Sequence, residues 1–76
     1  MFLGIPGRIT DVWEEGGAPV ADADFGGTQR LTCLAYLPDL AVGDYVTAHM
    51  GYALTKISES EALVTLGVMR SCGMLS

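Results

Sequence analysis

The amino-acid sequence predicts a mainly β fold: a small OB-like barrel of about five antiparallel strands with a C-terminal α-helix. Short runs rich in β-branched and aromatic residues alternate with glycine-containing turns through residues 1–57, as is typical of an all-β domain. A helix-start signal follows at residues 58–61. So many short strands in so few residues cannot form a two-sheet sandwich of ordinary size, whereas closing them into a barrel removes exposed sheet edges.

The first three strands are predicted from alternation and from turn residues, and they are expected at residues 8–13, 18–25 and 28–34. In the first, alternation slips between Ile9 and Val12, which predicts a β-bulge. In the third, Leu31 and Cys33 are expected to share the inner face. Short turns with paired glycines join these strands, which predicts a meander.

Two further strands are expected at residues 44–50 and 52–57, separated by Gly51. Alternation places His49 on the polar face of the first of them. The opposite, inner face is expected to carry Val46, Ala48 and Met50. The preceding connection, at residues 35–42, has no period of two and contains Pro38.

A capping box predicts the C-terminal helix. Ser58 is followed three residues later by Glu61, and the helix is expected over residues 59–70. The face expected to pack on the sheet carries Ala62, Leu63, Leu66 and Met69. Val64 and Val68 lie on the opposite side, so that side is either simply exposed or available to a partner.

Length and composition limit the classes of function. Seventy-six residues, half of them hydrophobic, form one small globular domain, predicted to comprise a barrel (1–57), a helix (58–70) and a tail (71–76). The net charge of −5 opposes the phosphate neutralisation that nucleic-acid binding needs. No secretory signal and no stretch of about 20 apolar residues occurs. We therefore expect no nucleic acid, no membrane association and a cytoplasmic location.

Catalytic motifs are absent from the sequence, which has a single His and no HExxH, phosphate-binding loop or nucleophile elbow. We expect that the protein is not an enzyme. The acidic strand residues Asp22 and Asp24 are expected to be solvated. The good soft or borderline metal ligands are His49, Cys33 and Cys72. Both thiols are expected to be reduced, and spacing alone leaves His49 either a surface histidine or part of a site.

The segment from Met1 to Ile9 is unusually apolar for a terminus. Pro6 fixes its own φ and favours an extended Ile5, while Gly7 permits a close backbone approach. The segment is therefore either the start of a core strand or an apolar tip offered to another protein.

Two motifs resemble those of a known family. The sequence LGIPGRI at residues 3–9 and VGDYVxxHxGYA at residues 42–53 are similar to the paired motifs of the HypC/HupF family of [NiFe]-hydrogenase maturation chaperones. The similarity extends over nearly the whole chain. It implies a small OB-like barrel without enzymatic activity.

The resemblance also implies partners and a cargo. Members of the family bind the maturation protein HypD and the precursor of the hydrogenase large subunit, and they help to deliver iron that carries cyanide and carbon monoxide, the Fe(CN)2CO group. For this chain it implies that His49 lies at or beside that iron. The residues implied in partner binding are Phe2, Leu3, Gly4, Ile5, Pro6 and His49.

Position 2 departs from the family, which begins Met-Cys and uses the thiolate of that cysteine as a soft ligand. Phe2 has no lone pair for iron, and its bulk disfavours removal of Met1, so we expect Met1 to be retained and iron handling to be impaired or lost. Phe2 is either an engineered substitution that disables the ligand or the mark of a natural paralogue. In both cases apolar docking of partners can survive.

A second class of function is an OB-fold module that binds a ligand or an oligonucleotide and is unrelated to hydrogenases, since this fold hosts many activities. The acidic charge and the lack of interleaved basic and aromatic residues argue against it.

Overall fold

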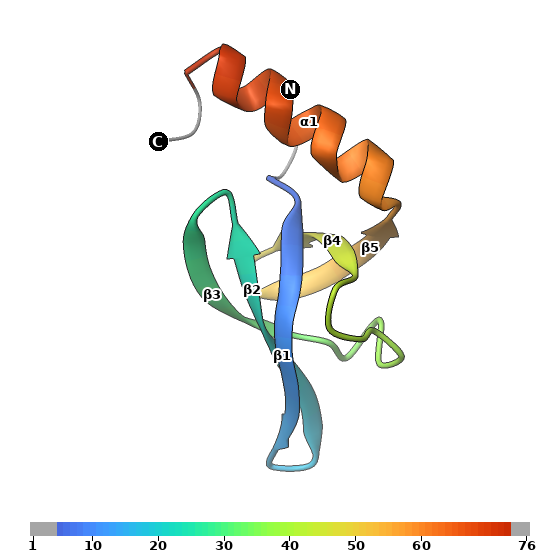
Figure 1. Ribbon diagram of the computed structural model, residues 1–76. Coiled ribbons are helices and arrows are strands. Elements are labelled where there is room, and N and C mark those ends of the chain that lie inside the picture. The colour runs from blue at the N-terminus through green and yellow to red at the C-terminus, as the bar shows by residue number, and fades with distance from the viewer. Residues whose placement is uncertain (1–4, 74–76) are drawn as a thin grey trace.

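The elements begin and end close to the turn residues of the sequence. The computed structural model describes residues 5–73, in which the strands form a closed barrel and the helix lies across one end, above the start of the first strand (Figure 1). The elements are β1 (Gly7–Glu15), β2 (Ala18–Phe25), β3 (Thr28–Cys33), β4 (Tyr45–His49), β5 (Tyr52–Ile57) and α1 (Glu59–Ser71). The predicted mainly β barrel with a C-terminal helix is confirmed.

The strand order around the barrel is β1-β2-β3-β5-β4, and β4 closes it by pairing with β1. Neighbouring strands are antiparallel with one exception: β3 and β5 are parallel and meet through Cys33 and Tyr52. The sequence predicted antiparallel strands only, so this parallel pair differs from the prediction. The cause is the path of the chain after β3. The connection leads to β4, which runs antiparallel to β1 and β5. The next strand, β5, therefore runs in the same direction as β3.

A β-bulge lies in β1, where the register with β2 shifts between Ile9 and Asp11. The bulge was predicted between Ile9 and Val12. The residue at its centre, Thr10, donates a hydrogen bond from its hydroxyl to the carbonyl of Asp22 on β2 (3.2 Å) and accepts one from the side chain of Gln29 on β3 (2.7 Å). The irregularity therefore links three strands.

The barrel interior is narrow and is filled by small and branched side chains, namely Ile9, Ala21, Ala23, Leu34, Leu40, Val46 and Ala53. The small side chains of Ala21 and Ala23 on β2 and of Ala53 on β5 leave room for the five strands to approach closely enough to close. The burial of Ala21 and Ala23 places their face of β2 inside the barrel.

The inner face of β3 differs from the prediction. Thr32 is 1% exposed, whereas Leu31 is 55% exposed and Cys33 is half-buried. The cause is the pairing register, which sets Thr32 opposite the inward-facing Ala21, because residues paired across a ladder share a face. The Thr32 hydroxyl donates to the carbonyl of Arg30 at 3.5 Å, so its polar atom is paired inside the barrel.

Helix α1 begins as its capping signal predicts. Ser58 is extended, and its hydroxyl oxygen accepts a hydrogen bond from the backbone N–H of Glu61 at 3.2 Å, which satisfies a donor that the first turn leaves free. The buried residues are Ala62, Leu66 and Met69. Leu63, expected with them, is exposed instead, as are Val64 and Val68. In residues 5–73 no helix is long and apolar enough to cross a membrane.

The turn between β4 and β5 consists of Met50 and Gly51, whose φ angles are 53° and 84°. Positive φ at both central positions is the mark of a type I′ hairpin turn, which matches the twist of the flanking strands. Met50 was expected to point inward at the end of β4. It is 85% exposed instead, because the strand ends at His49 and Met50 occupies the turn.

Close packing at the start of β1 explains why position 7 is a glycine. The sequence context only suggested that the backbone is approached closely there. A Cβ placed on Gly7 would overlap the ring of Phe25 at the end of β2. The ring therefore lies directly against the β1 backbone, and Pro6 beside it is fully buried.

We predict that Gly7→Ala lowers the free energy of unfolding by about 1–3 kcal/mol, because the new methyl group must displace the Phe25 ring. The control is Gly67→Ala in α1, where a Cβ would meet nothing within 4 Å. That variant should gain about 0.5–1 kcal/mol from helix propensity. Urea denaturation measures both, and a Gly7→Ala protein as stable as the unaltered one contradicts the packing.

We also predict that Met50→Asn raises the free energy of unfolding by about 0.5–1 kcal/mol, because asparagine before glycine is favoured in a type I′ turn and tolerates positive φ. Met50→Ala keeps the Cβ in the same backbone region and should give no such gain. Thermal denaturation of the three proteins tests the turn assignment, which equal midpoints for Met50→Asn and Met50→Ala would refute.

Candidate metal and docking site at the β4–β5 turn

His49 is the last residue of β4, and its side chain is exposed. The neighbouring Ala48 is paired with the buried Ala53, which places both of them on the inner face. His49 is paired with Tyr52 on the outer face. The type I′ turn that joins these two residues therefore holds the imidazole on the outside of the barrel, at the rim, where a ligand or a partner can reach it.

Aromatic side chains lie beside the imidazole on the outer surface. The ring of Tyr52 packs against that of Tyr36, with centroids 5.5 Å apart and an interplanar angle of 51°. Both tyrosines are exposed, Tyr36 in the connection after β3. Sequence reasoning gave Tyr36 no role, because the irregular segment 35–42 has no periodicity from which a face can be read. Exposed tyrosine pairs are typical of protein interfaces.

The metal donors of the sequence do not converge in the described part of the chain. Among residues 5–73 no group of three or more His, Cys, Asp or Glu side chains is placed to hold a metal ion. Cys33 and Cys72 are both free thiols. Cys33 lies on β3 next to Tyr52, so the β5 strand separates it from His49. His49 thus needs donors from elsewhere, since one side chain does not make a metal site.

The two acidic residues of β2, Asp22 and Asp24, make hydrogen bonds that stabilise the fold. The carboxylate of Asp24 accepts a hydrogen bond from the backbone N–H of Gly27 at 2.7 Å, which stabilises the β2–β3 turn. The carbonyl of Asp22 accepts from Thr10 in the bulge. Neither residue belongs to a metal cluster within residues 5–73.

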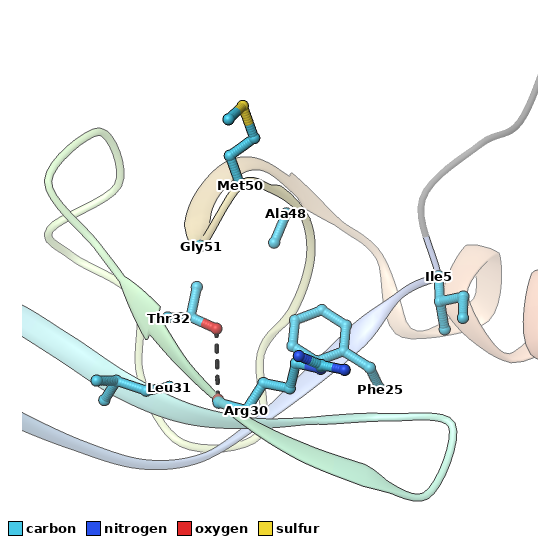
Figure 2. A pocket seen from close by; sticks show the side chains of 8 residues that line it. All are labelled: Ile5, Phe25, Arg30, Leu31, Thr32, Ala48, Met50 and Gly51. Atoms are coloured by element: carbon cyan, nitrogen blue, oxygen red, sulfur yellow. Dashed lines mark hydrogen bonds between the residues drawn. The ribbon is translucent and has the colours of Figure 1, made fainter.

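A hollow of about 380 Å³ opens beside the β4–β5 turn (Figure 2), and we call it the edge hollow. Its lining comprises Ile5 and Phe25, residues 30–32 of β3, and residues 48, 50 and 51 of the turn region. His49 lies between two lining residues in sequence. Ile5 therefore lines the same hollow as the residues that flank His49.

The N-terminal segment combines the two alternatives that the sequence left open. Pro6 and Gly7 are buried, as in a core strand, whereas Ile5 is half-buried and lines the edge hollow. Phe2, Leu3 and Gly4, expected to bind partners, lie outside the described residues. Arg30, a residue that sequence reasoning passed over, also lines the hollow.

Comparisons with known proteins agree with the motifs. The sequence model of the HupF/HypC family matches residues 1–69. The hydrogenase maturation factor HypC of Azotobacter chroococcum mcd 1 is 42% identical over 76 residues, which span all of this chain and 87% of that protein. HypC of Rhizobium leguminosarum bv. viciae is 36% identical over 97% of this chain and 95% of its own length. The hydrogenase maturation factor HybG of Escherichia coli K12 is 33% identical, with 92% and 89% covered. This chain belongs to the HupF/HypC family.

Proposed function

We propose that this protein is a hydrogenase maturation chaperone that binds a HypD-like maturation protein and the precursor of a [NiFe]-hydrogenase large subunit. The observation that carries the proposal is the family match over residues 1–69, together with relatives named hydrogenase maturation factors. A binding protein rather than an enzyme is proposed, in keeping with the lack of catalytic motifs in the sequence.

The physical basis for docking is the apolar surface around the β4–β5 turn. Met50 and Tyr52 are exposed beside His49, whose imidazole adds a polar group. Tyr36 packs on Tyr52, and the exposed Leu31 lines the edge hollow together with Met50. Apolar and aromatic side chains surrounding a polar group are typical of the centre of an interface. Because the turn is a tight hairpin between paired strands, its backbone loses little freedom on binding.

The proposed cargo is iron that carries cyanide and carbon monoxide, held only in transit and therefore a substrate of the chaperone. The imidazole of His49 is a borderline ligand that suits iron, and it is exposed at the rim. Phe2 replaces the thiolate that the family uses, so this chain offers one donor fewer. We propose that iron handling is weakened while partner docking persists.

We predict that capture of the two partners depends on the turn. When the protein carries an affinity tag and is produced together with a HypD-like protein and a large-subunit precursor, both should co-purify with it. Tyr52→Ala and Met50→Asp should each lower the captured amount at least tenfold, because they remove apolar contact area or place a charge in it.

Val64→Asp is the matched control, because Val64 is also an exposed apolar residue, but lies on α1. It should leave capture unchanged. If neither partner co-purifies with the unaltered protein, the proposed function is wrong. If Val64→Asp abolishes capture and the turn variants do not, the helix rather than the turn is the docking face.

For the cargo, we predict that Phe2→Cys protein purified without oxygen in complex with the HypD-like protein shows infrared bands of bound cyanide and carbon monoxide that are weak or absent with Phe2. Adding His49→Ala should remove them again. Phe2→Ser separates two effects of the change, since serine also permits removal of Met1 but supplies no soft thiolate. Bands of equal strength for Phe2, Ser and Cys at this position would exclude it as a ligand.

A further inference from the structure

The edge of β3 that faces away from β2 is largely unpaired. Toward β2, the strand is paired along its whole length, from Thr28 to Cys33. Toward β5, the pairing is limited to Cys33, which lies opposite Tyr52. Within the described chain, the edge at residues 28–31 therefore has no neighbouring strand. Such an edge presents backbone N–H and C=O groups that an added strand can pair.

The edge hollow runs along this unpaired stretch. Residues 30–32 of β3 line it on one side and Met50 and Gly51 on the other, and Phe25 lines it toward Ile5 (Figure 2). Its walls are mostly apolar. An extended segment placed on the β3 edge would therefore direct an alternate side chain into an apolar site, which is how strand addition acquires specificity.

Arg30 gives this hollow its charge. It is paired with the core residue Ala23 and so faces the barrel side of β3, whereas Asp22 and Asp24 on the adjoining β2 face the other way. The ion pair found within residues 5–73 joins Lys56 to Asp44 instead. Within residues 5–73 Arg30 forms no ion pair, and its guanidinium is complementary to a carboxylate supplied by a ligand.

We propose that the edge hollow binds an extended, acidic peptide segment of a partner protein, which adds as a strand to the β3 edge, places an apolar side chain in the hollow and a carboxylate on Arg30. The partner is one of the maturation proteins, so in this respect the inference rests on the proposed function. A polyanion such as an oligonucleotide is the poorer occupant. The chain has nine acidic residues and four basic ones, so it cannot neutralise many phosphates.

The test uses two peptides that differ only in charge, acetyl-Leu-Thr-Asp-amide and acetyl-Leu-Thr-Asn-amide, in which the first and third side chains of an added strand share a face, titrated into the full-length ¹⁵N-labelled protein. The acidic peptide should shift the amide resonances of residues 28–32 and 48–51, with at least fivefold higher affinity than the neutral one. N-methylation of its backbone amides should abolish binding, because an added strand needs its N–H donors.

Arg30→Gln should remove the preference for the acidic peptide. Lys56→Gln, which deletes the same charge from an exposed ion pair elsewhere, should keep it. Equal affinity of the two peptides, a preference that survives Arg30→Gln, shifts confined to α1, or stronger binding of a thymidine oligonucleotide at the same residues would each overturn the proposal.

Partner capture separates this inference from the function on which it rests. Arg30→Gln, but not Lys56→Gln, should lower co-purification of a maturation partner about fivefold. If the peptides bind through Arg30 and no maturation partner is captured by the unaltered protein, the proposed function fails and the peptide site stands. If partners are captured and Arg30→Gln affects neither capture nor peptide binding, the peptide site fails and the function stands.

Discussion

Closure of the barrel between β3 and β5 is the constraint on which the remaining structure depends. The two strands meet through Cys33 and Tyr52, supported by a hydrogen bond from the Cys33 N–H to the carbonyl of Gly51 at 2.7 Å. This short contact fixes the β4–β5 turn against β3 and sets His49 at the rim. Because the pairing is limited to this one residue pair, the rest of the β3 edge stays open beside the hollow.

Close packing connects residues 5–7 with that hollow. Pro6 is buried, and the absence of a side chain at Gly7 allows the Phe25 ring to lie on the β1 backbone. Ile5 and Phe25 then line one part of the hollow whose other part is formed by the turn. Two motifs that are about forty residues apart in the sequence thus border one surface, which gives a physical reason for their occurrence together.

Local signals in the sequence were sufficient for the elements, whereas contacts between strands decided the faces. The bulge near Ile9 and the cap at Ser58 depend on neighbouring residues, and both were predicted. The burial of Thr32 depends on its partner Ala21 across the ladder, and the parallel β3–β5 pair depends on the path of the connection. No pattern within β3 predicts the pairing with Ala21 or the parallel pair with β5. The place of Arg30 in the hollow follows from these two contacts between strands.

A carrier that passes its cargo to another protein must bind it incompletely. In the proposed role, a full set of donors on a small barrel would hold iron too firmly to release it, whereas a single imidazole, with no metal cluster in residues 5–73, would leave coordination positions for donors of the proposed partners. Specificity then has to come from contacts with the partner protein. In the proposed function, the exposed aromatic side chains, the open strand edge and Arg30 in the hollow would supply such contacts.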